Sequence, residues 1–338
     1  KYILEVYNLK KYFDVSDGIL KSQKKYLKAV DGIHLKVKAG ETLGIVGESG
    51  CGKSTTGNLI MNMLEPTEGK IIFDGVEWSS LSKKELREKR KDIQMIFQDP
   101  FSSLNPRMRV FDIIAEPLIT HDVAKGKKLK EMVHELLEIV GLDETYADRY
   151  PHEFSGGQRQ RIGIARALAL KPKLIVCDEP VSALDVSIQS QILNLLVKLQ
   201  KEFNLTYIFI AHGLPAVKYV SDRIAVMYLG RIVELTTKEQ LFQQPLHPYT
   251  EGLISAVPIP DPALRDAKER IILEGDIPSP VDPPSGCHFH TRCPLATEKC
   301  KTEVPELVEE RPDHFVACHY PLRDGKGIIQ RVEEVQPV

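Results

Sequence analysis

The stretch GESGCGKS, residues 47–54, constrains the fold of this chain more than any other. It matches the pattern G-x-x-x-x-G-K-[ST] and follows the apolar run TLGIV at residues 42–46, which predicts a buried strand. Glycines in such a loop let backbone N–H groups converge on an anion, and a helix beginning near Lys53 adds its positive end. A glycine-rich turn without a ligand is the alternative. Because the lysine and the hydroxyl stand where a phosphate and its metal need them, the sequence predicts a phosphate-binding loop in an α/β fold.

Individual residues of this loop have expected roles in nucleotide binding. Lys53 is expected to contact the β- and γ-phosphates, and the Ser54 hydroxyl to occupy one position around Mg²⁺. Cys51 lies beside Lys53 at a helix N-terminus, which should lower the pKa of its thiol. We therefore expect alkylation of Cys51 to abolish ATP binding and ATP to protect the thiol; an inert buried thiol is the alternative. The expected nucleotide contacts are Gly47, Glu48, Ser49, Gly50, Cys51, Gly52, Lys53, Ser54 and Thr55.

The composition is typical of a well-packed globular chain. Of its 338 residues, 42% are hydrophobic and 27% are charged, and the length allows two domains. The formal net charge of −2 offers no polybasic surface, so nucleic acid is not expected as a partner. The apolar runs are far shorter than the roughly 20 residues that a membrane span needs. No signal-peptide pattern is present in the sequence.

Polar residues follow three more predicted strands. The apolar strand at residues 174–177 ends in Asp178 and Glu179, which suits one acid to hold Mg²⁺ and the other to polarise water. Capping of the following turn is the alternative role for this pair. Gln98 follows a strand at residues 93–97. His212 follows another strand, and although a lone histidine is more often structural, its place at this edge makes it a candidate contact of the γ-phosphate.

Two further features are candidates for nucleotide contact. A second anion-binding turn is expected where a strongly helical stretch begins, at Ser155, Gly156, Gly157 and Gln158. A plain loop and helix cap is the alternative. Upstream of the phosphate loop, Phe13 and, as second choice, Tyr12 offer a ring for stacking on a purine; packing in an edge strand is the alternative.

The last part of the chain differs in composition from the rest. After residues 247–249, prolines at positions 258, 260, 262, 278, 280, 283 and 284 predict an extended, irregular segment and a separate module. Few apolar residues in periodic runs follow Pro258, so we expect this module to depend on a bound metal for folding. ATP binding by residues 1–245 is expected to survive a Cys→Ser change that loses this metal. Four cysteines gather here with the spacing Cys-x5-Cys-x6-Cys-x17-Cys, namely Cys287, Cys293, Cys300 and Cys318.

Taken in order, these motifs resemble the ATP-binding subunit of an ABC transporter. Several stretches resemble the oligopeptide and dipeptide importers more finely, namely residues 29–32, 98–106, 184–189 and 247–250. With the cysteine segment, the resemblance covers nearly the whole chain. It implies an α/β P-loop NTPase core of the ABC type at residues 1–245, with a helical subdomain at about 99–168. It also implies a small irregular C-terminal module at residues 246–338, ligated by its cysteines.

The resemblance implies a role for each motif. Ser54, Gln98 and Asp178 would surround Mg²⁺, Glu179 would be the general base for water, and His212 would sense the γ-phosphate. Residues 155–158 and Asp185 would close on ATP held by a partner subunit, because in this family the nucleotide lies between two such domains. Residues 101–108 would face the transmembrane partners. The family usually has an acid after the histidine, and this chain has Gly213, which leaves the orientation of His212 open.

The spacing of the four late cysteines resembles the cluster segment of members of this importer family. Cys-x2-Cys pairs, which are typical of structural zinc, are absent, and Cys293 precedes Pro294 as in some iron–sulfur sites. We therefore expect one [4Fe–4S] cluster on these four thiolates. Unligated thiols are one alternative, disulfides are the least expected arrangement, and zinc is another alternative with substitute ligands from His288, His290 or His319.

The expected function is ATP hydrolysis that powers a peptide importer from the cytoplasmic side of the membrane. The expected partners are transmembrane permease subunits, a second ATP-binding subunit that is a copy or a relative, and indirectly an extracellular substrate-binding protein. A soluble ABC-type switch and an iron–sulfur protein that uses ATP for redox or metal handling are the alternatives. Repair switches would need a long coiled-coil insertion and translation switches usually have a second cassette, and the sequence has neither. The cargo stays open between dipeptide, oligopeptide, nickel and sugar, because cargo touches other subunits.

Overall fold

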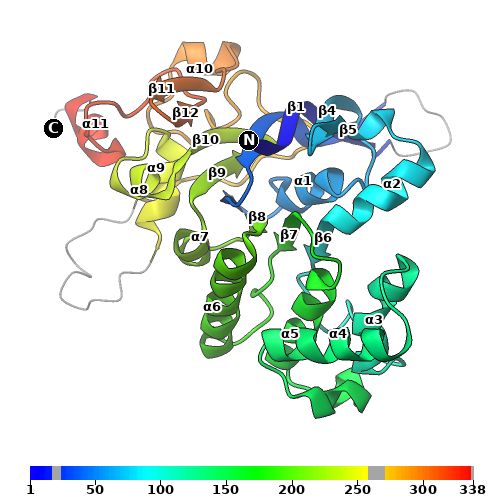
Figure 1. Cartoon of the computed structure of the whole chain (residues 1–338). Helices are drawn as coiled ribbons and strands as arrows, with labels where there is room; N and C mark the ends of the chain where they lie inside the picture. Colours follow the sequence, from blue (N-terminus) through cyan, green and yellow to red (C-terminus); the bar gives the residue numbers. More distant parts are fainter. Residues whose placement is uncertain (17–23, 258–270, 336–338) are drawn as a thin grey trace.

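The structure of this chain is a computed structural model that describes residues 1–16, 24–257 and 271–335. Residues 258–270, where the sequence predicted part of a proline-rich segment, lie outside the described residues. Two β-sheets of 8 and 4 strands occupy one end of the molecule, and a group of helices occupies the other (Figure 1). Within the described ranges, no helix combines the length and the apolar character needed to cross a bilayer.

The larger sheet carries the edge at which the functional motifs meet. Its strand order is β11-β12-β10-β9-β3-β8-β7-β6. The strands from β9 to β6 in this order run parallel, whereas β10, β12 and β11 continue the sheet antiparallel. Parallel strands end at the same edge, where open α/β sheets bind their ligands. The strands are β3 (Thr42–Val46), β6 (Ile93–Ile96), β7 (Leu174–Asp178), β8 (Thr206–Ile210), β9 (Arg223–Tyr228), β10 (Arg231–Thr237), β11 (Val308–Arg311) and β12 (His314–Val316).

The smaller sheet is antiparallel and has the order β2-β1-β4-β5. Its strands are β1 (Tyr2–Asp14), β2 (Tyr26–Lys38), β4 (Glu68–Phe73) and β5 (Val76–Glu77). Helix α1 (Lys53–Ile60) packs against both sheets. Its buried Leu59 and Ile60 belong to one hydrophobic cluster that includes side chains of both sheets. This packing fixes the helix that begins at the phosphate loop.

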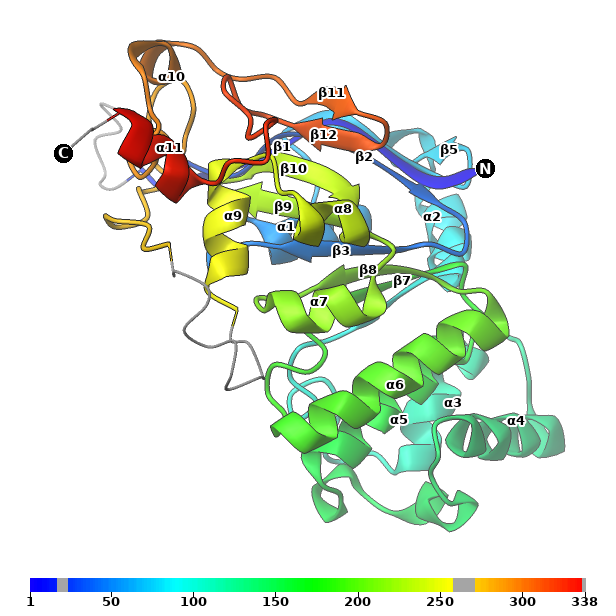
Figure 2. The same cartoon turned by 90° about the vertical axis from the view of Figure 1, so that its left-hand side faces the viewer.

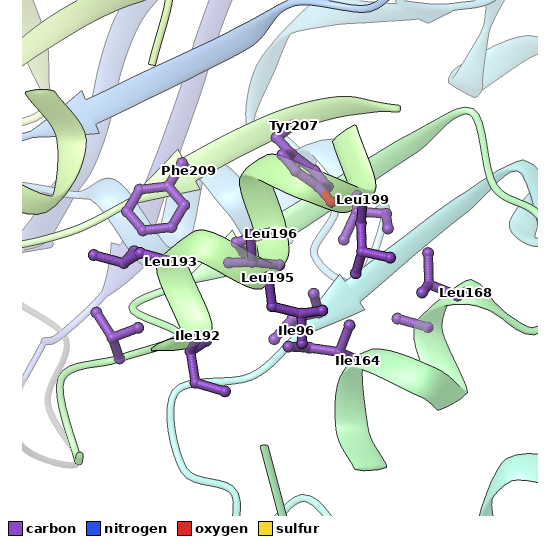
Figure 3. Close-up of a cluster of buried hydrophobic side chains, with 14 of the residues drawn as sticks. Ile96, Ile164, Leu168, Ile192, Leu193, Leu195, Leu196, Leu199, Tyr207 and Phe209 are labelled. Carbon is purple, nitrogen blue, oxygen red and sulfur yellow. The ribbon is translucent and has the colours of Figure 1, made fainter. Parts of the chain in front are cut away.

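A second core lies on the other face of the larger sheet. Helix α6 (Val186–Phe203) contributes Ile192, Leu193, Leu195, Leu196 and Leu199 at helical spacing, which forms one apolar face. These side chains share one buried cluster with Tyr207 and Phe209 of β8 and with Ile164 and Leu168 of helix α5 (Gly156–Leu168) (Figure 3). The core therefore joins the sheet to the helical end of the molecule.

The helical end holds the elements between β6 and β7. It consists of α3 (Val110–Thr120), α4 (Gly126–Ile139) and α5 (Gly156–Leu168), which lie within residues 99–168, where the sequence predicted a helical subdomain. Both views place these helices away from the smaller sheet (Figures 1 and 2). The remaining helices that flank the sheets are α2 (Lys83–Lys89), α7 (Leu214–Val220), α8 (Lys238–Gln243) and α9 (Pro248–Ser255).

The C-terminal residues do not form the separate irregular module expected from the sequence. Strand β12 pairs with β10, so β11 and β12 extend the sheet of the nucleotide-binding core (Figure 2). Phe289 is buried in the main core, and Cys287 and Cys293 pack against it. The segment has few periodic apolar runs because it completes a core supplied by the rest of the chain. Its helices are α10 (Glu298–Thr302) and α11 (Ile328–Val335).

Candidate nucleotide-binding site

The predicted phosphate loop connects β3 to α1 at the carboxyl edge of the sheet. Gly52 is the N-cap of α1 and has φ of 101°, in the left-handed region that favours glycine. A Cβ on Gly52 would lie 2.1 Å from the carbonyl oxygen of Ala29, so no other residue fits this turn. The loop is therefore held against β2 by a contact that only glycine permits, with the N-terminus of α1 at its end.

The ammonium group of Lys53 lies inside this loop. Its Nζ donates to the carbonyl oxygens of Gly47 at 2.8 Å and Glu48 at 3.1 Å. Lys53 is only 4% exposed, so its charge is placed close to the loop backbone rather than in solvent. These two carbonyl groups therefore fix the position of the lysine ammonium group within the loop.

The first two residues of the predicted metal site are in direct contact. Ser54 Oγ donates a hydrogen bond to Asp178 Oδ1 at 2.9 Å. Burial raises the pKa of the Asp178 carboxyl above its usual range, while Ser54 and the nearby Lys53 act in the opposite direction. A hydroxyl and a partly desolvated carboxylate on two adjacent elements fit the oxygen ligands that Mg²⁺ prefers. Gln98, the third predicted ligand, follows β6 and is exposed.

Glu179 and His212 also meet. Glu179 Oε1 lies 2.7 Å from His212 Nε2, within hydrogen-bond distance. Glu179 is 5% exposed and has φ of 49°, which is uncommon for a residue with a Cβ and typical of functional sites. Its second oxygen, Oε2, is buried and has no hydrogen-bond partner within the described part of the chain. A buried carboxylate with one oxygen free to accept a proton is the arrangement that a general base needs.

The replacement of the family's acid by Gly213 does not remove this contact. Gly213 is the N-cap of α7, and its φ of −96° is open to any residue. A Cβ there would lie 3.7 Å from Pro215 Cδ, an ordinary van der Waals contact, so space does not require glycine. His212 is therefore oriented by Glu179 without help from the next residue.

The second predicted anion-binding turn belongs to the helical end of the molecule. Ser155 is the N-cap of α5 and forms a capping box with Gln158, whose backbone N–H donates to Ser155 Oγ at 3.3 Å. Gly157 is required by packing, because a Cβ there would lie 2.5 Å from Ile188 Cγ2. Asp185 is exposed at the N-cap of α6, the helix that carries Ile188. Near the start of α5, Gln160 Nε2 donates to the carbonyl oxygens of Phe97 and Pro180, at 3.3 and 2.8 Å.

The two aromatic candidates lie near the end of β1. The hydroxyl of Tyr12 donates to Asp31 Oδ1, which anchors its ring, and Lys28 Nζ lies 5.7 Å from the ring centroid. Phe13 has no such anchor, and Lys11 Nζ lies 5.2 Å from its centroid. Both rings are partly exposed, and stacking of either on a purine stays a prediction.

The expected low pKa of Cys51 is wrong. Cys51 is 4% exposed, and burial raises the pKa of its thiol above the usual value despite the opposing charge of Lys53. The helix N-terminus and the lysine are visible in the sequence, whereas the packing that encloses the sulfur is not.

We therefore expect Cys51 to resist alkylation in the native protein. A raised thiol pKa leaves less thiolate at pH 7.5, and the reaction should accelerate as the pH rises. Maleimide labelling followed by peptide mass spectrometry should be at least about tenfold slower at Cys51 in the folded than in the unfolded chain. Cys177, which is fully buried, is the matched control for an inaccessible thiol. Equal labelling rates of Cys51 in the folded and unfolded chains would contradict this expectation.

The four late cysteines converge on one small cavity. Cys287, Cys293, Cys300 and Cys318 line a cavity of about 20 Å³, together with His290 and His319 among others. Burial raises the pKa of the Cys293 and Cys318 thiols to about 12. Among the residues that the structure describes, no group of three or more His, Cys, Asp or Glu side chains is arranged to hold a metal ion. The expectation of a cysteine-ligated module is therefore not confirmed, although the thiols do gather.

Two contacts with the phosphate loop were missed in the sequence. Tyr249 Oη accepts a hydrogen bond from the backbone N–H of Glu48 at 3.0 Å. Arg292 forms two hydrogen bonds with the Glu48 carboxylate across 244 residues of sequence. No local pattern announces either contact, because both depend on how the C-terminal residues return to the core.

Comparison with known proteins now decides the family. A family profile described as ABC transporter matches residues 30–182, and one described as oligopeptide/dipeptide transporter, C-terminal region, matches residues 233–300. The chain is 56% identical to the oligopeptide transport ATP-binding protein AppF of Bacillus subtilis over 94% of this chain and 97% of the relative. The chain belongs to the oligopeptide/dipeptide family of ABC transporter ATP-binding subunits.

Other members of this family and of the fold agree. The oligopeptide transport ATP-binding protein OppF of Escherichia coli is 54% identical over 94% of this chain and 96% of its own length. Among solved structures, the dimeric ATP-binding cassette MJ0796 bound to ADP and Pi is 31% identical, with a TM-score of 0.61 over 70% of this chain and 98% of that one. The ABC ATPase fold predicted from the motifs is confirmed.

Proposed function

We propose that this chain is the ATP-hydrolysing subunit of an importer for oligopeptides or dipeptides, working at the cytoplasmic face of the membrane. One observation carries the enzymatic part: Ser54 contacts Asp178 while the adjacent Glu179 contacts His212, all beside the phosphate loop. The peptide cargo is supported by relatives in Bacillus subtilis and Escherichia coli that are oligopeptide transport proteins.

In this function the chain's residues divide the work of hydrolysis. The loop amides and Lys53 would hold the phosphates of ATP, and Ser54, Asp178 and Gln98 would hold Mg²⁺, which would neutralise phosphate charge. Glu179 takes the proton of the attacking water on its free oxygen Oε2. His212 steadies the other oxygen of Glu179 and contacts the γ-phosphate.

The working unit contains two such subunits. Residues 155–158 cap the start of α5 and are not part of the phosphate loop before α1, and they serve a nucleotide held by the partner subunit. Exposed Asp185 lies at the same interface. The dimeric form of the structural relative MJ0796 supports this arrangement.

Permease subunits dock beside Gln98, at residues 101–108. Phe101 is 55% exposed, and the guanidinium of Arg159 lies 4.0 Å from its ring centroid. A large exposed ring on the helical end of the molecule fits a protein partner better than solvent. An extracellular substrate-binding protein delivers the peptide to those permeases.

The four cysteines would hold one [4Fe–4S] cluster, which would tie the C-terminal turns together. Support comes from the convergence of the thiols on one cavity and from the Cys293–Pro294 pair. The cavity of about 20 Å³ holds roughly one water, so the thiols would have to move for a cluster to fit.

Replacing Cys300 by serine is expected to remove the cluster and to make the C-terminal residues sensitive to protease, because one lost ligand opens the site. The measurement is iron, sulfide and zinc content of anaerobically purified protein, with limited proteolysis of the variant. Cys177→Ser is the matched control, since Cys177 lies away from this cavity. A content of one zinc per chain without sulfide would show that zinc, not a cluster, occupies the site. A metal-free protein that resists protease would contradict both the cluster and the structural role of a metal.

The function is tested by purifying the native complex from membranes. Permease subunits and bound peptide should co-purify, and peptide-loaded binding protein should stimulate ATP hydrolysis. Hydrolysis by the chain with no permease in the complex would favour a soluble switch instead. A rate of ATP hydrolysis that falls when the four cysteines are replaced, and that does not respond to peptide-loaded binding protein, would favour the iron–sulfur alternative.

A further inference from the structure

We propose that Arg292 is a positioning residue for the phosphate loop, which acts through Glu48 on Lys53. This inference rests on the proposed binding of MgATP to the loop. Arg292 belongs to the C-terminal segment, outside the motifs that bind nucleotide. It gives that segment a part in nucleotide affinity rather than in folding alone.

The contact between Arg292 and Glu48 is bidentate. Arg292 Nη1 donates to Glu48 Oε2 at 2.8 Å, and Nη2 donates to Oε1 at 3.1 Å. The side chain of Arg292 is 6% exposed and that of Glu48 is 25% exposed, so solvent screens this pair only in part. Two parallel charged hydrogen bonds fix the direction of the carboxylate as well as its distance.

Glu48 in turn fixes the catalytic lysine. Its backbone N–H donates to Tyr249 Oη at 3.0 Å, while its carbonyl oxygen accepts from Lys53 Nζ at 3.1 Å. The same carbonyl accepts from the backbone N–H of Cys51 at 3.3 Å. Glu48 is therefore held on one side by C-terminal residues and holds the loop and its lysine on the other.

The anchor behind Arg292 is a packed aromatic cluster. The backbone N–H of Arg292 donates to the carbonyl of Phe289 at 3.0 Å. The ring of Phe289 lies 5.3 Å from that of Tyr228 and 5.4 Å from that of Tyr249. Arg292 and Tyr249, which both contact Glu48, are therefore both held by Phe289. Phe289 and Arg292 lie between Cys287 and Cys293 in the sequence, so a few residues connect the cysteine cavity to the phosphate loop.

Arg292→Ala in the full chain is expected to weaken MgATP binding by about tenfold, because it leaves the Glu48 carboxylate without its partner. Arg292→Lys should give an intermediate affinity, since an ammonium cannot form both parallel bonds. The matched control is Arg323→Ala, which removes an equally bidentate pair with Glu310, at 2.7 and 2.6 Å, whose arginine is exposed and which lies in the same segment. The measurement is the dissociation constant of MgATP for the folded fraction, with metal content and melting temperature recorded for each variant.

A purely structural role for Arg292 would lower the melting temperature and leave this dissociation constant unchanged, which would overturn the inference. The double variant Glu48→Ala with Arg292→Ala should bind no more weakly than Glu48→Ala alone, because both changes break the same contact. Additive losses would show that Arg292 does not act through Glu48. A wild-type chain that binds no MgATP would instead overturn the proposed function itself.

Discussion

Glutamine in place of Glu179 is expected to lower ATP turnover by roughly 10³-fold, because the amide cannot take a proton from water. MgATP binding should persist, since Lys53, Ser54 and Asp178 are unchanged. The variant should therefore accumulate as an ATP-bound dimer. The measurement is steady-state hydrolysis together with sedimentation in the presence of MgATP.

The glutamine variant keeps the shape of the buried side chain, so a loss of turnover is not a loss of packing. The matched control is Glu144→Gln, which changes an exposed carboxylate that contacts His134 at 2.9 Å, a glutamate–histidine pair away from the site. It should hydrolyse ATP like the wild type. Unchanged turnover in Glu179→Gln would remove Glu179 from the role of general base.

Removal of residues 246–338 is expected to unfold the remaining chain, although the sequence predicted a separate module there. The buried carboxylate of Glu234 accepts from the backbone N–H groups of Leu246 and His247, at 2.7 and 2.9 Å. It also contacts His314 Nε2 at 2.6 Å. All three partners lie in the removed segment, which would leave an uncompensated charge inside the core.

The same deletion removes two fully buried rings, Tyr249 and Phe289. Each ring contributes about 3–5 kcal/mol, and a typical domain has a free energy of unfolding of only about 5–15 kcal/mol. The measurement is circular dichroism and thermal unfolding of the truncated chain, with MgATP binding. Phe289→Ala should show part of the loss and the exposed-site variant Lys301→Ala none. A truncated chain that melts cooperatively and binds MgATP would contradict this account of the C-terminal residues.

The nucleotide motifs could be predicted because their chemistry is local. The phosphate loop, the paired acids after β7 and the histidine after β8 each follow an apolar strand, and parallel strands bring their ends together. Glu179 and His212 do lie at the same edge of the sheet, where their side chains are in contact. Gly213 raised a doubt about His212 that the geometry of this contact removes.

What the sequence did not reveal depends on burial and on distant pairing. The thiol pKa of Cys51 is governed by the atoms that enclose the sulfur, which outweigh the nearby lysine. The C-terminal strands β11 and β12 have only four and three residues, and they join the main sheet through the pairing of β12 with β10. Arg292 lies far along the chain from Glu48, so no local spacing could indicate that they meet.

The central claim is that ATP hydrolysis by this chain drives peptide import. The most direct measurement is uptake of a labelled oligopeptide into proteoliposomes that hold the native complex, with the binding protein on one side and MgATP on the side of this subunit. We expect uptake that requires MgATP and is abolished by Glu179→Gln while Glu144→Gln leaves it intact. Peptide uptake that proceeds equally without MgATP, or with Glu179→Gln in both ATP sites, would contradict the account.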